Sequence, residues 1–211
     1  MHTLNSLTVY AASSTKISQT YIDAAARLGT ILADHGIRLI YGAGAVGLMG
    51  SVADAVIEHG GRLTGVIPQF MVDQGWCHPV FKGAKQYPYD GESPDADVAL
   101  VVTESMHERK AAICRWGDAM LALPGGIGTF EELTECLTWK QLGLHTKPVV
   151  ILNTDGYYDD LLHCFNRMVS ECFMRDLHRD MYRVVSSPEE VIDAILTCPQ
   201  WDASIRKQAQ L

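Results

Sequence analysis

Residues 121–132, Leu-Ala-Leu-Pro-Gly-Gly-Ile-Gly-Thr-Phe-Glu-Glu, join an apolar strand to a helix through a turn with three glycines. A turn of this kind leaves backbone N–H groups free at the start of a helix, where they bind anions. Two acidic residues, Glu131 and Glu132, follow the glycines one helical turn later. An anion cradle beside a carboxylate indicates chemistry on a phosphorylated molecule rather than binding alone.

The rest of the chain alternates short apolar segments with segments of helical spacing. The segments expected to form strands are residues 7–12, 38–41, 63–67, 98–102, 119–123, 149–152 and 184–185. The segments expected to form helices are residues 19–35, 48–59, 106–116, 130–142, 157–173 and 188–196. Nearly continuous apolar strands are typical of a sheet that is buried on both faces. The pattern therefore predicts an α/β fold with a doubly wound parallel sheet in three αβα layers.

Ligands bind such sheets beyond the carboxyl ends of the strands, where the strand order reverses. Three features of the sequence fall at strand ends of this kind: the pair Ser13-Ser14 and the glycine turns within residues 41–50 and 124–129. We therefore expect Ser14, and Gly44 from the first glycine turn, to line a ligand site.

Length and composition indicate a single globular domain over residues 1–211. Hydrophobic residues make up 47% of the chain and charged residues 20%, which suits a normal core. The formal net charge of -8 argues against nucleic acid or an anionic membrane surface as a partner, since both attract a basic face. Residues 69–97 break the rhythm of strands and helices, and we expect them to form a long loop over the strand ends. Such a loop is either a functional lid or a surface insertion.

The six cysteines are scattered along the chain and form no C-x-x-C pair. This distribution is typical of reduced thiols in a cytosolic protein rather than of disulfides or a zinc site, and no metal site is expected. No apolar run of about 18 residues predicts a membrane-spanning helix. The first residues also lack the basic-then-apolar layout of a secretory signal, so we expect a cytoplasmic protein.

The first glycine turn, at residues 41–50, contains the pattern G-x-G-x-x-G between a strand and a helix. A dinucleotide site would also need a carboxylate at the end of the next strand, to bind a ribose hydroxyl. That strand ends with Val66, Ile67 and Pro68, which argues against NAD. The glycines either permit only a tight turn and close helix packing, or support the binding of a phosphate or ribose.

Two roles are open for Glu132. Thr129-x-x-Glu132 matches a capping box, in which the glutamate accepts a hydrogen bond from the threonine N–H at the start of a helix. Alternatively, the Glu132 carboxylate faces a ligand held by the glycine turn. We favour the second role because the glycines already shape the start of this helix.

Arg109 stands where a cation is not expected. It lies in the first turns of a helix that Ser105 and Glu108 are predicted to cap, and the helix dipole disfavours positive charge there. Its spacing also places it on the apolar, inward face of that helix, with Ala112, Ile113 and Trp116. A buried arginine needs a partner. Glu132 is the candidate, either in a purely structural pair or in a pair that a ligand enters.

Residues 106–110, Met-His-Glu-Arg-Lys, together with residues 124–132, closely resemble motifs of the Lonely-guy family. The likeness extends over about residues 8–196 and includes residues 41–50 and 137–143. Members of this family are nucleoside 5′-monophosphate phosphoribohydrolases that release free cytokinin bases, and they were long mislabelled lysine decarboxylases. The resemblance implies a Rossmann-like fold, no metal or organic cofactor, and a homodimer with its sites near the subunit interface.

The resemblance also assigns site residues. It places the catalytic pair of the family, an arginine and the second of two glutamates, at Arg109 and Glu132. The residues implied to bind the 5′-phosphate in the glycine turn are Gly126, Gly128 and Thr129. The positions implied to make further substrate contacts are Met106, Lys110 and Thr138.

The chain departs from the family pattern in several places. Its first strand ends Ala-Ala-Ser-Ser rather than Cys-Gly-Ser-Ser, and Ala43 replaces a glycine. A glutamate usual after the third strand is replaced near Gly75, and residues 87–97 look inserted. The implied catalytic pair is intact. The predicted reaction is therefore hydrolysis of the N-glycosidic bond of AMP or a cytokinin riboside 5′-monophosphate, with the preferred base left open by the changed loops.

Two further functions are open to the same sequence. A non-catalytic nucleotide or phospho-cofactor binding protein would use the same anion cradle, and it differs from the hydrolase only in turnover. An amino-acid decarboxylase fits less well, because it needs a pyridoxal Schiff-base lysine in a larger scaffold and no residue of the sequence marks one.

Overall fold

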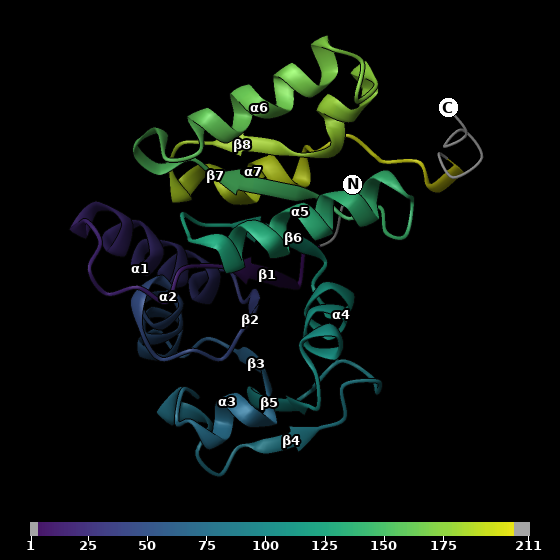
Figure 1. Cartoon of the computed structure of the whole chain (residues 1–211). Coiled ribbons are helices and arrows are strands. Elements are labelled where there is room, and N and C mark those ends of the chain that lie inside the picture. The colour runs from purple at the N-terminus through teal and green to yellow at the C-terminus, as the bar shows by residue number, and fades with distance from the viewer. Residues whose placement is uncertain (1–3, 205–211) are drawn as a thin grey trace.

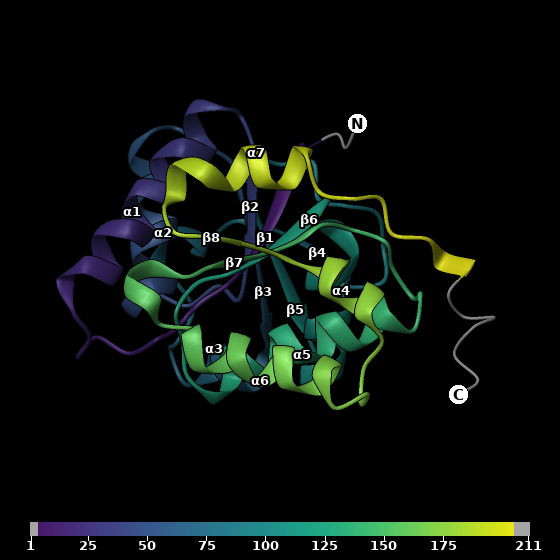
Figure 2. The same ribbon diagram turned by 90° about the horizontal axis from the view of Figure 1, so that it is seen from above.

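A computed structural model describes residues 4–204 as a parallel sheet of eight strands with helices on both faces (Figures 1 and 2). The strand order is β4-β5-β3-β2-β1-β6-β7-β8, and neighbouring strands are parallel throughout. The predicted doubly wound, three-layer α/β fold is confirmed.

The elements follow the predicted alternation. The strands are β1 (Ser6–Tyr10), β2 (Arg38–Tyr41), β3 (Leu63–Pro68), β4 (Lys85–Tyr87), β5 (Val98–Thr103), β6 (Ala119–Ala122), β7 (Val149–Leu152) and β8 (Arg183–Val185). The helices are α1 (Gln19–Asp34), α2 (Gly47–Glu58), α3 (Gln69–Asp73), α4 (Met106–Trp116), α5 (Ile127–Gln141), α6 (Asp159–Ser170) and α7 (Val191–Leu196). Short 3-10 helices lie at Pro79–Phe81 (η1), Thr154–Gly156 (η2), Asp176–Met181 (η3) and Pro188–Glu190 (η4).

Two apolar layers cover the sheet because successive side chains of a strand point to opposite faces. One layer joins Leu7 of β1 to α1, α2 and α7, for example through Leu28. The other joins Met120 of β6 to α4, α5 and α6, for example through Ile113 and Leu133. Figure 2 shows α7 and α6 on opposite sides of the strands. Both α4 and α5 therefore lie on one face of the sheet.

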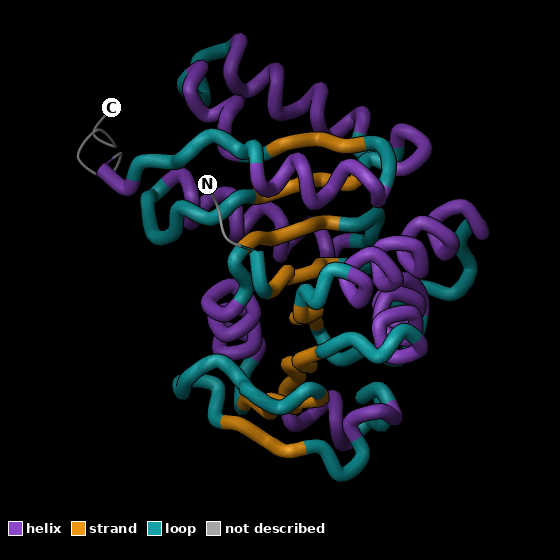
Figure 3. Tube along the Cα trace, turned by 180° about the vertical axis from the view of Figure 1, so that it is seen from behind, coloured by secondary structure: helices purple, strands orange, loops and turns teal. Residues whose placement is uncertain are grey.

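The strand order reverses at β1, which pairs with β2 on one side and with β6 on the other. From β1 the chain continues through β2 to β3, whereas β6 leads through β7 to β8 at the opposite edge (Figure 3). The loops that follow the carboxyl ends of β1 and β6 diverge at this point, which opens a crevice for a ligand. Both the Ser13-Ser14 pair and the second glycine turn lie in these loops.

Residues 69–97 contain more secondary structure than the predicted long loop. They include α3, η1 and β4, and β4 pairs with β5 at the edge of the sheet. The prediction missed β4 because Lys85-Gln86-Tyr87 is short and largely exposed, and so shows no apolar alternation. At the other end of the chain, α6 ends at Ser170, before the predicted end at residue 173.

The six cysteines, at positions 77, 114, 136, 164, 172 and 198, are all within the described range, and those at positions 77, 114, 136, 164 and 172 are free thiols. Along residues 4–204, no helix is long and apolar enough to cross a bilayer. In the same range, His, Cys, Asp and Glu side chains form no group of three that could hold a metal ion.

Candidate functional site

The start of α5 is an open helix end. The helix begins at Ile127, three residues before the predicted start, and Gly126 is its N-cap. Among the described residues, no side chain caps this end, and the first turn carries no acidic residue. The first N–H groups of a helix lack acceptors within the helix, so those of Ile127, Gly128 and Thr129 can bind an anion. A Cβ added at Gly126 or Gly128 would meet nothing within 4 Å, so space for a ligand is present.

This start excludes the capping-box role for Glu132. A capping box would need Thr129 at the N-cap, but Gly126 takes that position and Thr129 lies inside the first turn, buried. The predicted helix start, at residue 130, was wrong. The prediction assigned all the glycines to the turn before the helix, whereas Gly128 lies in the first turn of α5. The Glu132 carboxylate is instead directed across to α4.

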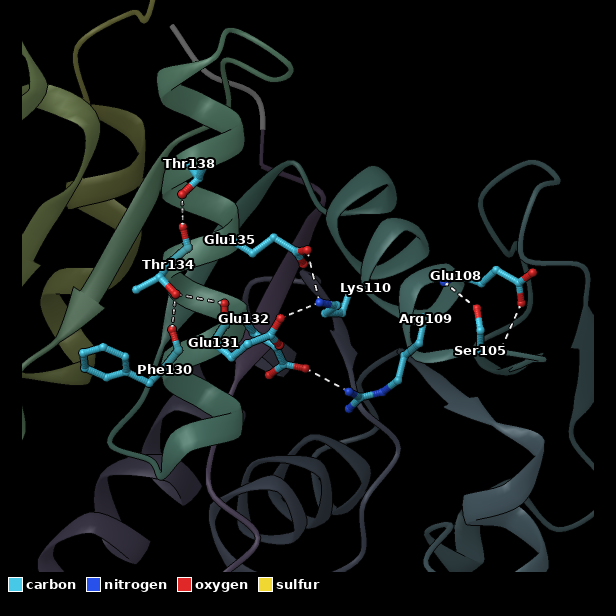
Figure 4. Close-up of polar contacts among 10 residues, drawn as sticks. All are labelled: Ser105, Glu108, Arg109, Lys110, Phe130, Glu131, Glu132, Thr134, Glu135 and Thr138. Atoms are coloured by element: carbon cyan, nitrogen blue, oxygen red, sulfur yellow. Dashed lines mark hydrogen bonds and ion pairs between the residues drawn. The ribbon is translucent and has the colours of Figure 1, made fainter.

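Arg109 on α4 and Glu132 on α5 point toward one another and form an ion pair (Figure 4). Arg109 Nη1 donates to Glu132 Oε1 at 2.9 Å, and Arg109 Nε donates to the carbonyl oxygen of Val66 at 3.2 Å. The two side chains are only 9% and 12% exposed. The buried arginine thus has the carboxylate partner that the sequence predicted, and β3 fixes its guanidinium from the other side.

The environment of Glu132 perturbs its acidity. Burial raises the pKa of Glu132 above its usual range, while the positive charge of Arg109 opposes that rise and the negative charge of Glu131 adds to it. A titratable group with a perturbed pKa, beside a fixed charge in a cleft, is typical of functional sites. The pair is therefore a candidate for the functional centre of this cavity.

Lys110 links α4 to α5 beside this pair (Figure 4). Its Nζ donates to Glu131 at 2.5 Å and to Glu135 at 3.1 Å. Burial lowers the pKa of Lys110, but the hydrogen bonds to these two carboxylates outweigh burial and leave the pKa raised. Although Lys110 was predicted to contact substrate, it is not among the residues that line the cavity containing Arg109 and Glu132.

A cavity of about 420 Å³, which we name the cradle cavity, lies between the end of β1 and the start of α5. Its lining contains most of the predicted site residues: Ser14, Met106, Arg109, Gly126, Gly128, Thr129 and Glu132. These residues come from the loops after β1 and β6 and from α4 and α5. The crevice at the strand reversal therefore holds an anion cradle and an ion pair together.

A second cavity of about 400 Å³, which we name the apolar chamber, adjoins the cradle cavity. The two share Ser13, Met49, Met71 and Arg109. The chamber is also lined by Gly44, as expected, and by the apolar side chains of Val46, Ile67 and Trp76. Met49, Met71 and Trp76 were not predicted from the sequence to line a site. Trp76 could have been noticed as a large aromatic residue directly after Gly75, in a loop beyond a strand end.

Thr138 lies apart from both cavities. It lies on α5, six residues beyond Glu132 (Figure 4). Its hydroxyl donates to the carbonyl oxygen of Thr134 at 2.7 Å. Thr138 lines a separate groove of about 190 Å³, together with Thr134, Leu137, Gln141, Phe165, Met168, Met174, Met181 and Tyr182. Within one chain, the structure does not bring Thr138 to the predicted site.

Comparisons with known proteins identify the family of this chain. A family model described as "Possible lysine decarboxylase" matches residues 49–195. The chain is 42% identical over 181 residues to a cytokinin riboside 5′-monophosphate phosphoribohydrolase of Arabidopsis thaliana, covering 85% of this chain and 76% of the relative. The chain belongs to the Lonely-guy family. A relative of the same name from Oryza sativa subsp. japonica is 40% identical over 193 residues, covering 92% of this chain and 72% of the relative.

Membership of the Lonely-guy family confirms the predicted enzyme class. Phosphoribohydrolases are hydrolases that act on N-glycosyl bonds, and the curated relatives carry that name.

Solved structures agree on the fold. The molybdenum cofactor carrier protein of Chlamydomonas reinhardtii superimposes with a TM-score of 0.62 at 19% identity, covering 93% of this chain and 98% of that one. The molybdenum cofactor binding protein of Rippkaea orientalis gives a TM-score of 0.60 at 21% identity, with 91% and 96% covered. At these identities the likeness shows the shared fold alone.

Proposed function

We propose that this protein hydrolyses the N-glycosidic bond of a nucleoside 5′-monophosphate, either AMP or a cytokinin riboside 5′-monophosphate. The products are the free base and ribose 5-phosphate. The observation that carries the proposal is a single cavity that contains both the open start of α5 and the buried Glu132 carboxylate, which Arg109 holds at 2.9 Å. The names of the relatives support the second of these substrates, a cytokinin riboside 5′-monophosphate.

In this proposal the substrate is held by its phosphate. The N–H groups of Ile127, Gly128 and Thr129, which follow the N-cap residue Gly126, bind the phosphate oxygens, aided by the positive end of the helix dipole. Because the phosphate is remote from the bond that breaks, its binding energy serves to hold and orient the ribose. The base then extends past Arg109 into the apolar chamber, which adjoins the cradle cavity.

Glu132 acts at the anomeric carbon of the ribose. As the bond from C1′ to the base nitrogen lengthens, positive charge grows on the ribose ring, and the ionised carboxylate stabilises it. Glu132 also orients the water whose oxygen bonds to C1′, and this water releases one proton to the solvent. The departing base keeps the bonding electrons and takes up one proton from the solvent, so the protons balance. Arg109 acts as a positioning group for Glu132, since its guanidinium is fixed between that carboxylate and the Val66 carbonyl.

The groove between α5 and α6 supports a proposed homodimer. Its methionine and aromatic side chains, together with the exposed Phe130 beside it on α5, form an apolar surface that a second copy can cover. Covering this groove brings Thr138 to a subunit interface, where it can contact the substrate of the partner. The free thiols of Cys77, Cys114, Cys136, Cys164 and Cys172 are consistent with the predicted cytoplasmic location of this dimer.

The decisive experiment measures base release. Purified protein is incubated with AMP and with N6-isopentenyl-AMP, and free base and ribose 5-phosphate are quantified by chromatography, with the Glu132→Gln variant as control. Equal release of both products by the wild type, absent in the variant, supports the hydrolase. Tight nucleotide binding without any base at high enzyme concentration favours the non-catalytic binding function instead. Sedimentation analysis tests the homodimer separately.

A further inference from the structure

Trp76 lies at the mouth of the apolar chamber. Its residue surface is 56% exposed, yet it lines the chamber with Met71 and Val46. Val46, also on the chamber lining, and Phe70 on the adjoining α3 are about half exposed as well. Large apolar side chains gathered at the opening of a cavity mark a binding surface, because leaving them in water is unfavourable without an occupant.

The segment that carries Trp76 is fixed to the first glycine turn. Cys77 forms an antiparallel bridge with Gly44, and the His78 N–H donates to the Ala43 carbonyl at 2.8 Å. The His78 ring also contacts Asp54 on α2, with Nε2 at 3.0 Å from Oδ1. On the other side, the Trp76 N–H donates to the Met71 carbonyl at 3.1 Å. These contacts hold the backbone of Trp76 in place at the chamber.

The chamber offers few polar groups to a base. Apart from the indole N–H of Trp76, the polar groups on its lining side chains belong to Ser13 and Arg109. Arg109 is already committed to Glu132 and to the Val66 carbonyl. A site of this kind discriminates by apolar area and aromatic stacking rather than by hydrogen bonds to the edge of a base.

The size of the chamber supports an occupant larger than a bare purine. Its volume of about 400 Å³ falls in the range of sites for drug-sized ligands, about 300–1,000 Å³. The methionine side chains of Met49 and Met71 line it and adapt to irregular apolar shapes.

We propose that Trp76 is a specificity-determining residue whose indole packs on the base and favours nucleoside monophosphates with an extended apolar substituent over AMP. This inference rests on the proposed function, in which the phosphate occupies the start of α5 and the base enters the chamber. Because Trp76 is outside the cradle cavity lining, it does not act on the phosphate or ribose.

The test compares Trp76→Ala and Trp76→Phe with Phe173→Ala, a matched control at an exposed aromatic that lines neither cavity. For each protein, kcat/KM is measured with AMP and with N6-benzyl-AMP. We expect Trp76→Ala to reduce the preference for N6-benzyl-AMP over AMP by about tenfold or more. Trp76→Phe retains most of the preference, and Phe173→Ala leaves it unchanged.

A binding measurement makes the inference independent of turnover. The same Trp76 substitutions are placed in the Glu132→Gln background, and dissociation constants are measured calorimetrically for AMP, N6-benzyl-AMP and ribose 5-phosphate. We expect Trp76→Ala to weaken N6-benzyl-AMP selectively and to leave ribose 5-phosphate unchanged. An equal loss for both nucleotides, a parallel loss for ribose 5-phosphate, or no loss overturns the role of Trp76. Absence of base release from the wild type instead overturns only the hydrolase.

Discussion

The two glycine-rich turns occupy equivalent places, each between the carboxyl end of a strand and the start of a helix, but their glycines meet different neighbours. In the first turn, a Cβ added at Gly47 would lie 2.6 Å from the carbonyl carbon of Ser13, and one at Gly50 would lie 2.5 Å from the Ala45 carbonyl oxygen. In the second turn, a Cβ at Gly126 or Gly128 would meet nothing within 4 Å. At Gly47 and Gly50 the first turn is closed by the protein itself, whereas at Gly126 and Gly128 the second turn is open to a ligand.

The helices on either side of the ion pair show the same contrast. Ser105 and Glu108 cap α4 with a complete capping box, as predicted from the sequence. The start of α5 has no side-chain cap among the described residues. A helix start whose first N–H groups are open beside a cavity can bind an anion. A helix start whose N–H groups are hydrogen-bonded to its own side chains has only a structural role. Glycines at a strand end therefore indicate an anion site only when their surroundings are empty.

The largest expected effect comes from the carboxylate that follows the open turn. Glu132→Gln removes the charge that stabilises the ribose cation, so we expect turnover to fall by at least about a thousandfold, or ~4 kcal/mol of transition-state stabilisation. Nucleotide binding, measured by calorimetry, persists because the N–H groups of α5 remain. Retained turnover with a lower melting temperature would show that Glu132 has only a structural role.

Gly42 tests how the closed turn supports the reaction centre. A Cβ at this position would lie 2.0 Å from Arg109 Nη2, so Gly42→Ala pushes the guanidinium away from Glu132. A displacement of about 1 Å at a reaction centre lowers activity by about a hundredfold. Steady-state kinetics measure this loss, and a crystal structure of the variant shows whether Arg109 has moved. Unchanged kinetics would mean that the position of Arg109 is unimportant.

Gly128→Ala is the matched change in the open turn. The added methyl group meets no protein atom, so the melting temperature stays unchanged or rises slightly. It occupies ligand space, and we expect KM for the nucleotide to rise about tenfold, a loss of ~1.4 kcal/mol. In a calorimetric titration, we likewise expect Gly128→Ala to bind ribose 5-phosphate more weakly than the wild type does. A drop in melting temperature without a change in KM would show that the second turn, like the first, is packed against the protein rather than open to a ligand.

Ser105→Ala measures how much the capping box of α4 contributes to the free energy of unfolding. Loss of the hydrogen bond from the Glu108 N–H to Ser105 Oγ, 3.2 Å long, lowers the free energy of unfolding by about 1 kcal/mol. Chemical denaturation followed by circular dichroism gives this value. Ser105→Asp serves as the control, because aspartate also caps helices and keeps the stability.

The smallest effect is on the pH profile. Burial raises the pKa of Glu132, so kcat/KM falls as the pH drops through a value above that of an ordinary glutamate. Glu131 adds to this rise through its negative charge. Glu131→Gln removes that charge, and we expect the acidic limb of the profile to move to lower pH. Activity that stays constant or rises as the pH falls through this range would exclude ionised Glu132 as the active form.

Much of the fold follows from patterns that are local in the sequence. The alternation of apolar and helical segments predicted the parallel sheet, and Ser105-x-x-Glu108 predicted the start of α4, because these features depend on neighbours a few residues apart. The edge strand β4 and the start of α5 were missed. The pairing of β4 with β5 is a non-local contact, and the start of α5 depends on how Gly126 and Gly128 continue into the helix.

For the site, the sequence by itself marked the two residues that we propose for the chemistry, since an arginine on an apolar helix face and a glutamate after an open turn are both locally unusual. Only the tertiary structure decided which of them meet. The reversal of strand order at β1 places α4 and α5 on one face, so Arg109 and Glu132 join across 23 residues of sequence. The same packing leaves Thr138 in another groove and brings Trp76 to the chamber, because contacts distant in sequence are set by sheet order and helix packing, which no local pattern encodes.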